Sequence, residues 1–245
     1  MKKALVTSCI ALLMSGSANA GTIFSQSLTG AGLLSDGNVT TYESPVLNGS
    51  RLDYTSRSVS QGALLRWDIL GASSYNDLTV NVQVNHDVLN AGDNDLYFAL
   101  SDGVNFVAAS RVDNGGGGIF LYDGAVNATP TPTPAFDGFI NALSSLGPAN
   151  PPVDFSVLLP SGGADATLLS ASEGAATSGS FAYDRGLNTN NGLQLYLFGD
   201  GISEDYGINS ITVSVDEADV SEPGALAVFG LGLFALGYMR RRRSV

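Results

Sequence analysis

The chain has 245 residues, and its 11 basic and 23 acidic residues give it a formal net charge of −12. Six of the basic residues stand at the two ends, as Lys2, Lys3 and Arg240–Arg243. Residues 21–222 therefore hold five arginines against all 23 acidic residues, which is a formal charge of −18. A segment with this charge repels a phosphate backbone, which excludes nucleic acid as a partner, and its length suits one sizeable domain.

Residues 1–20 predict a secretory signal peptide that signal peptidase removes. Two lysines precede an apolar stretch, Ala4–Met14, and the segment ends with Ala18 and Ala20 in a small-x-small pattern. About 11 apolar residues are too few to span a bilayer core of about 30 Å. The only cysteine, Cys9, lies inside this segment, so the processed chain has neither a disulfide nor a cysteine nucleophile.

The body shows an apolar period of two, which predicts half-buried antiparallel strands. The clearest examples are 78–84, 193–198 and 208–215, where aliphatic residues alternate with polar or aromatic ones. Shorter strand-like runs lie at 63–70, 96–101, 105–112, 119–122, 155–159 and 166–169. Asp102 and Gly103 predict a hairpin turn between two of these runs. Nine or so short strands predict an all-β fold, a single antiparallel β-sandwich of jelly-roll type.

One short helix is expected near the middle of the chain. Five apolar residues fall at helical spacing between Pro134 and Gly147, namely Phe136, Phe139, Ile140, Leu143 and Leu146. The preceding Thr-Pro repeat, residues 129–134, predicts an extended connector. Strands of similar composition resume after the helix, which favours a long inter-strand loop over a linker between two domains.

No catalytic signature stands out in the body. The single histidine, His86, directly follows the 78–84 strand and lacks a nucleophile-elbow motif, so an exposed residue at a strand end is the ordinary interpretation. A zinc site needs several histidine or cysteine ligands, which this chain cannot supply. A glycosidase needs only two carboxylates, and no local pattern nominates a pair among the 23 acidic residues.

Aromatic side chains are the candidates for binding sugar on a sandwich surface. They are Trp67, Tyr75, Tyr97, Tyr122, Tyr183, Tyr196 and Tyr206. Trp67 lies within the apolar 64–70 run, and we expect it to belong to the core instead.

Aspartates next to glycine or asparagine allow two interpretations. Turn chemistry is the simpler one, because aspartate binds its own backbone and glycine supplies positive φ. Calcium binding is the alternative, since carboxylate and carbonyl oxygens are the ligands this ion takes. The candidate ligands are Asp93, Asp95, Asp200, Glu204 and Asp205. These residues lie in two segments, 93–95 and 200–205, and neither segment matches an EF-hand loop. The chain is therefore expected to need no cofactor, with calcium as the possible exception.

The carboxyl-terminal segment, residues 220–245, has three elements in order. The first is a short motif within residues 220–224, formed by Ser221, Glu222, Pro223 and Gly224. An apolar run, residues 225–239, then predicts a transmembrane helix. Arg240, Arg241, Arg242 and Arg243 follow as a basic membrane-stop, which the positive-inside rule places in the cytoplasm. The body, residues 21–219, therefore lies outside the cytoplasm before any processing.

These three elements closely resemble a PEP-CTERM sorting signal, with Ser221 where the family most often has its first proline. The resemblance covers the carboxyl-terminal tail only. It implies a precursor anchored in the inner membrane of a Gram-negative bacterium and cut by an exosortase near Glu222 and Pro223. It also implies a mature protein released or transferred to the cell surface, in an organism that makes exopolysaccharide or biofilm.

The sequence thus predicts an exported, exosortase-sorted protein of the cell surface or extracellular matrix. Its expected role is structural or adhesive, without catalysis, among extracellular polysaccharide. A calcium-assisted carbohydrate-binding module is one alternative, and a glycan-active hydrolase or lyase is another.

Overall fold

A computed structural model describes residues 21–55, 57–89, 95–112, 117–127, 130–144, 152–201 and 205–218. The signal peptide and the sorting signal predicted from the sequence lie outside these residues. Among the described residues, no helix is long and apolar enough to cross a membrane. Residues Thr22–Glu217 form one compact unit.

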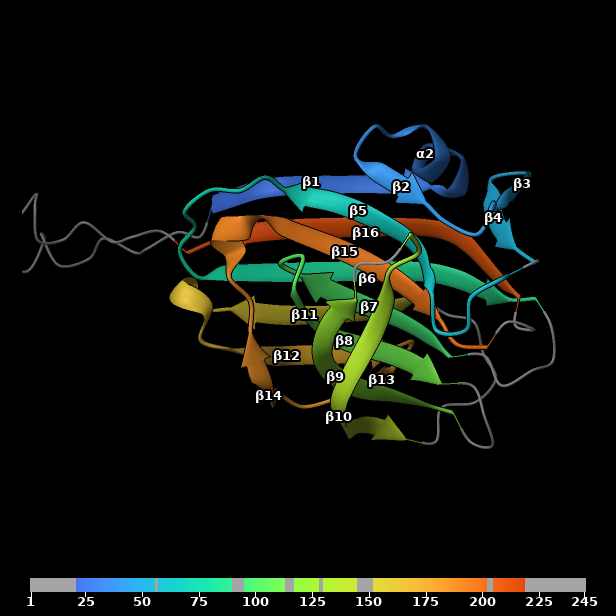
Figure 1. Cartoon of the computed structure of the whole chain (residues 1–245). Coiled ribbons are helices and arrows are strands. Elements are labelled where there is room, and N and C mark those ends of the chain that lie inside the picture. Colours follow the sequence, from blue (N-terminus) through green and yellow to red (C-terminus); the bar gives the residue numbers. More distant parts are fainter. Residues whose placement is uncertain are drawn as a thin grey trace, which may run out of the picture. The chain divides into compact units, whose positions relative to one another are not determined.

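The described elements are almost all strands (Figure 1). In chain order they are β1 (Gly21–Thr29), α2 (Gly30–Ser35), β2 (Val39–Thr41), β3 (Val46–Asn48), β4 (Arg51–Tyr54), β5 (Ala63–Leu70), β6 (Leu78–Val88), β7 (Leu96–Ser101), β8 (Asn105–Val112), β9 (Gly118–Asn127), β10 (Thr133–Ser144), β11 (Val153–Leu159), η1 (Ser161–Gly163), β12 (Asp165–Glu173), β13 (Ala176–Thr177), β14 (Phe181–Gly186), η2 (Thr189–Asn191), β15 (Leu193–Gly199) and β16 (Tyr206–Glu217).

Two antiparallel sheets pack face to face, which confirms the predicted all-β sandwich. The nine-stranded sheet has the order β13-β12-β11-β6-β16-β4-β3, with β1 beside β16 and β14 beside β12. The seven-stranded sheet has the order β10-β9-β8-β7-β15-β5-β2. Between them lies the main core, to which both sheets contribute alternate residues.

The period-two pattern places side chains as predicted on both faces of the central strands. On β6, Val80, Val82 and Val84 are buried in the core, while the intervening polar residues point outward. Trp67 of β5 is fully buried and meets Phe24 edge-on at 5.9 Å between ring centroids. The prediction that Trp67 belongs to the core is confirmed.

The position of His86 differs from the exposed strand end that the sequence predicts. Strand β6 continues to Val88, past the 78–84 run that the sequence predicts, so His86 lies within the strand and its side chain faces the core. It is 4% exposed and lies at 6.0 Å from the Phe98 ring centroid. A strand-end surface position is therefore wrong, because two further residues continue the ladder with β16 beyond it.

The segment predicted as a helix is strand β10, paired with β9. Two β-bulges explain the helical spacing of its apolar residues. Phe136 and Phe139 lie three apart but face Gly124 and Tyr122, which lie two apart, because one extra residue interrupts the ladder between them. A second irregularity between Asn141 and Leu143 has the same effect. Bulges thus produced the spacing of an amphipathic helix in a strand.

The preceding proline-rich segment connects two strands of one sheet, as the sequence favours, and its last two residues, Thr133 and Pro134, already belong to β10. It joins β9 to its antiparallel neighbour β10, whose first pair is Thr133 opposite Asn127. The one described α-helix, α2, lies elsewhere and was not predicted. It has six residues and begins after Thr29, whose side chain accepts a hydrogen bond from the Gly32 amide at 3.4 Å.

Candidate functional site

The outer face of the seven-stranded sheet carries a second buried cluster, separate from the main core. Its members are Ala63, Tyr97, Ala99, Phe106, Ala108, Tyr196 and Phe198. These residues alternate with the inward-facing residues of the same strands, so they point away from the nine-stranded sheet. An outer sheet face is normally solvated, and burial here requires a cover.

The curled β9–β10 hairpin provides that cover. Phe136 of β10 reaches the ring of Tyr97 on β7 at 4.9 Å, although β9 and β8 separate the two strands in the sheet. At the turn of the hairpin, the Ala63 amide of β5 donates to the Pro132 carbonyl at 2.8 Å. In Figure 1, β10 accordingly passes in front of β7 and β8. A Cβ on Gly124 would meet the Ala135 carbonyl oxygen at 2.0 Å, so the close approach requires glycine.

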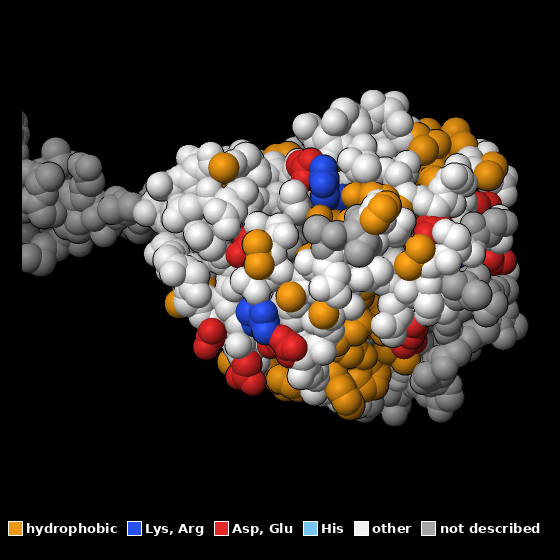
Figure 2. All heavy atoms as spheres, viewed as in Figure 1, with side chains coloured by type: hydrophobic (Ala, Val, Ile, Leu, Met, Phe, Trp, Pro, Cys, Tyr) orange, Lys and Arg blue, Asp and Glu red, His pale blue; other side chains and the backbone are white. Residues whose placement is uncertain are grey.

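Four aromatic side chains continue from this cluster to the surface, and we call them the aromatic patch: Phe120, Tyr122, Phe136 and Phe139. Tyr122 lies at their centre, 5.0 Å from Phe136 and 6.1 Å from Phe139. Phe139 is 67% exposed. In Figure 2, a patch of hydrophobic side chains lies over β9 and β10, with charged side chains at its border.

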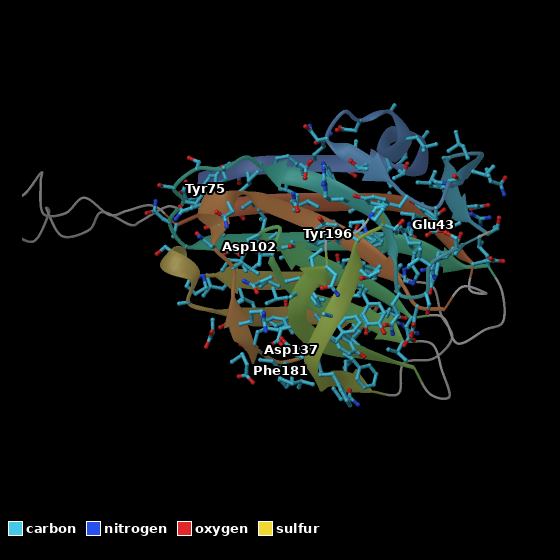
Figure 3. The ribbon with its side chains drawn as sticks, viewed as in Figure 1. Glu43, Tyr75, Asp102, Asp137, Phe181 and Tyr196 are labelled. Carbon is cyan, nitrogen blue, oxygen red and sulfur yellow. The ribbon has the colours of Figure 1, made fainter. Side chains whose placement is uncertain are left out.

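Charged groups lie at the edges of the aromatic patch. Burial raises the pKa of Tyr122, and the nearby carboxylates of Asp95 and Asp200 raise it further. Asp137, next to Phe136 at the bulge of β10, pairs with Arg185 of β14, which also donates to the Asn105 side chain at 2.7 Å. Figure 3 labels Asp137 beside this curled edge and Tyr196 nearer the middle of the face.

Most of the aromatics nominated from the sequence are structural. Tyr97, Tyr183, Tyr196 and Tyr206 are at most 4% exposed, and Trp67 is fully buried. Only Tyr75 and Tyr122 reach the surface in part. The other rings of the patch are phenylalanines: Phe136 and Phe139, which the sequence assigned to a helix, and Phe120, which it left unnamed. Of these, Phe139 is exposed and the other two are half-buried. Finding these rings requires the register of β9 against β10. The bulges in β10 interrupt the alternation of side chains, so the sequence pattern does not reveal this register.

The two predicted calcium loops do approach each other, because the Asp200 amide donates to the Asp95 carbonyl at 3.0 Å. Asp93 and Glu204 lie outside the described residues. Asp205 is described, and its carbonyl accepts from the Leu89 amide at 3.3 Å. Among the described residues, no group of three or more His, Cys, Asp or Glu side chains is placed to hold a metal ion.

Arg57 occupies the carbonyl oxygens of this loop region. Its guanidinium is buried, donates to the carbonyls of Asp200 at 2.9 Å and Gly199 at 3.0 Å, and also contacts the Gly201 carbonyl. It also lies over the ring of Tyr206, 5.4 Å from the centroid. A fixed side-chain cation therefore occupies the carbonyl oxygens of Gly199, Asp200 and Gly201.

Turn chemistry accounts for another of the Asp-Gly pairs. The buried Asp102 carboxylate, labelled in Figure 3, accepts from the amides of Val104 at 2.9 Å, Asn105 at 2.8 Å and Asn188 at 2.8 Å. Gly103 follows it with a φ of +88°, in the hairpin that the sequence predicts between β7 and β8. Because three backbone amides donate to this carboxylate, its role is to hold the turn and the neighbouring loop in place.

The outer face of the nine-stranded sheet has a shallow groove of about 340 Å³. Of the side chains that line it, only Asp154 is a carboxylate. A glycosidase site needs two carboxyl groups on either side of the scissile bond. This groove therefore does not offer the pair that such a mechanism uses.

Residues 219–243 match the model of the PEP-CTERM protein-sorting motif. The carboxyl-terminal tail is a PEP-CTERM sorting motif. The motif implies export, with a membrane-anchored precursor that an exosortase processes. It covers only the end of the chain, and no curated protein matches the sequence significantly.

Solved structures resemble the chain in fold. One is the CBM2 module of the evolved Dit protein of Lactobacillus casei BL23 phage J-1, with 9% identity, a TM-score of 0.48, and 82% of this chain and 99% of that one covered. Another is the carbohydrate recognition domain of Emp47p, with 13% identity, a TM-score of 0.47, and coverage of 80% and 98%. A legume lectin-like domain from Entamoeba histolytica has 6% identity, a TM-score of 0.49, and coverage of 77% and 95%. At these values the likeness concerns the fold alone.

Proposed function

We propose that this chain is an exosortase-sorted surface or matrix protein whose sandwich adheres to extracellular polysaccharide without catalysis. The aromatic patch carries the proposal. Phe139 is 67% exposed and contacts the rings of Phe120 and Tyr122. An exposed apolar patch of this kind lowers the solubility of a protein and commonly marks a binding surface. Sites for small polar ligands combine aromatic faces with a few placed polar groups.

Sugar suits this surface better than other ligands. A flat ring face packs against the C–H face of a sugar, while Arg185 and the carboxylates around the patch can bind its hydroxyls. The formal charge of −18 on residues 21–222 disfavours an anionic polymer. A neutral or weakly charged glycan is therefore the proposed ligand class.

The route to the surface follows from the two ends. Signal peptidase would remove residues 1–20, and residues 225–239 would anchor the precursor in the inner membrane of a Gram-negative cell. Exosortase would then cut within residues 221–224 and leave residues 21–219 as one jelly-roll-like domain in an exopolysaccharide or biofilm matrix. The described strands begin at Gly21 and end at Glu217, so both cuts would leave the strands whole.

The test is affinity electrophoresis of the exported protein through gels that contain the producing organism's polysaccharide. Phe139→Ala is expected to weaken binding about tenfold, since an exposed ring contributes roughly 1.4 kcal/mol in such a contact. Val46→Ala, at a site 62% exposed on β3, is the matched control and should bind like the wild type. Equal binding by the wild type and both variants would rule out the aromatic patch as the polysaccharide-binding site.

The same samples separate the alternatives. A hydrolase or lyase would shorten the polysaccharide, which size-exclusion chromatography detects, and we expect its length to stay constant. A calcium-assisted module would lose binding when a chelator is added. We expect binding to persist, because Arg57 already satisfies the carbonyl oxygens of Gly199, Asp200 and Gly201.

A further inference from the structure

Polar side chains make up most of the lining of the groove on the nine-stranded sheet. It crosses four adjacent strands, β12, β11, β6 and β16, in that order. Seven of its lining residues point outward from these strands: Asn81, Gln83, Asp154, Ser156, Ser170, Thr212 and Ser214. Six of these seven are hydroxyl or amide side chains on four paired strands, and none of the seven is aromatic.

The strand register arranges these residues in two rows. One row runs Ser170, Ser156, Asn81 and Ser214, each opposite the next across a strand pair. The second row runs Asp154, Gln83 and Thr212, two residues further along each strand. With neighbouring strands about 4.8 Å apart, the first row extends roughly 14 Å across the sheet. Its three serines are short, which leaves room beside the longer side chains of the second row.

Hydrogen bonds hold the rows in place before any ligand arrives. Ser156 donates to the Asn81 carbonyl oxygen at 2.7 Å, and Gln83 donates to Asp154 at 2.7 Å. The Asn81 side-chain N–H also donates to the Ser214 hydroxyl at 3.4 Å. Each amide group offers two N–H donors and a carbonyl with two lone pairs, so these contacts leave further donors and acceptors on both amides for a ligand. The amides are thus oriented, which reduces the entropy cost of binding.

The charge of the groove selects the ligand. Of the described residues that line it, Asp154 alone is charged, and the Gln83 side chain donates a hydrogen bond to that carboxylate. Among the described residues that line it there is no arginine or lysine to bind a phosphate, sulfate or uronate group. Alternating donors and acceptors in a row suit a neutral chain of hydroxyl groups. We infer that this groove is a second glycan site, which holds a neutral polysaccharide strand across β12, β11, β6 and β16.

The inference has a consequence that rests on the proposed function. The aromatic patch and the groove lie on the outer faces of the two opposed sheets, which point in opposite directions. One copy would then hold two polysaccharide strands at once and cross-link them. No oligomer would be needed, because both sites belong to the same sandwich.

The experiment uses the exported protein with hydroxyethyl cellulose as the neutral probe and alginate as the anionic one. Gln83→Leu removes the amide from an exposed position, and Ser170→Gln fills the groove with a neutral side chain. Asn85→Leu is the matched control, since Asn85 lies on the same face of β6 but does not line the groove. We expect both groove variants to weaken retardation by hydroxyethyl cellulose at least threefold and the control to leave it unchanged.

The outcomes separate the two sites. If Phe139→Ala weakens binding and the groove variants do not, the groove inference is overturned while the proposed function stands. If only the groove variants weaken binding, the groove site stands and the aromatic patch is overturned. Retardation by alginate but not by hydroxyethyl cellulose contradicts a neutral ligand. Cross-linking, followed as a rise in light scattering, should disappear in either single-site variant.

Discussion

His86 couples the stability of the sandwich to pH. Its imidazole is buried between the sheets, with Phe98 against one side, and its Nδ1 has no hydrogen-bond partner among the described residues. Burial lowers the pKa of His86 to about 4, and the nearby Arg111 guanidinium adds to this effect, while Asp87 opposes it. Arg111 is itself paired with Glu173 across the sandwich, so a protonated imidazole would lie beside an existing cation.

The pH prediction follows from this environment. In the unfolded chain His86 has a pKa near 6.5, so below that pH the unfolded state takes up the proton first and stability falls. Between pH 7.5 and pH 4.5 the loss due to His86 is about 2.5 kcal/mol. Urea unfolding at both pH values, for the wild type and His86→Leu, measures it. The variant should lack that part of the pH dependence. An equal change in the free energy of unfolding between the two pH values for both proteins would contradict the prediction.

At the scale of elements, the β9–β10 hairpin decides where the candidate site lies. The irregularity between Phe136 and Gly138 brings Phe136 and Phe139 onto the same face, and the curl of the hairpin carries Phe136 over β7 and β8. The alanines at positions 63, 99 and 108 leave room beneath it, so tyrosines and phenylalanines of the outer face are buried. The hairpin thus turns part of a solvated face into a small core with an aromatic rim.

Two glycines of this hairpin provide a matched test. Gly124→Ala places a methyl group 2.0 Å from the Ala135 carbonyl oxygen and 2.9 Å from the Phe106 ring, so the hairpin must move away. We expect a loss of about 1–3 kcal/mol in the free energy of unfolding, as for other overpacked sites. Gly138→Ala on the paired strand has open space and should change stability by less than about 0.5 kcal/mol. Similar urea midpoints for both variants would contradict the hairpin's tight packing.

At the scale of the whole molecule, the chain divides its tasks between the ends and the body. The PEP-CTERM motif occupies residues 219–243, and the compact unit covers Thr22–Glu217. The body carries the acidic charge and both candidate glycan surfaces, whereas the ends carry the lysines and four of the nine arginines. On the proposed route, removal of the ends would change the location of the protein without removing a described strand.

Processing predicts a defined product. The intact mass of the protein from culture medium, cell surface and inner membrane should show a species that begins at Gly21 and ends near Glu222 outside the inner membrane. Exclusive recovery from the inner membrane of a species that still contains residues 225–245 would mean a permanent anchor, against the proposed route.

Local patterns in the sequence determined much of this protein. The period of two predicted the central strands, the apolar 64–70 run predicted the burial of Trp67, and the ordered motif, apolar run and arginines predicted the sorting tail. Each of these signals depends only on neighbouring residues. The sorting signal of the protein and its all-β fold class can therefore be predicted from the sequence itself.

Tertiary structure alone decided where the candidate sites lie. Bulges shift the phase of a strand, so β10 had the spacing of a helix, and only its register with β9 shows which rings share a face. Arg57 meets carbonyls more than 140 residues away in the chain, and the groove joins residues of β6 with others 71 or more positions away. Contacts of this kind form by sheet pairing and curling, which no local pattern encodes.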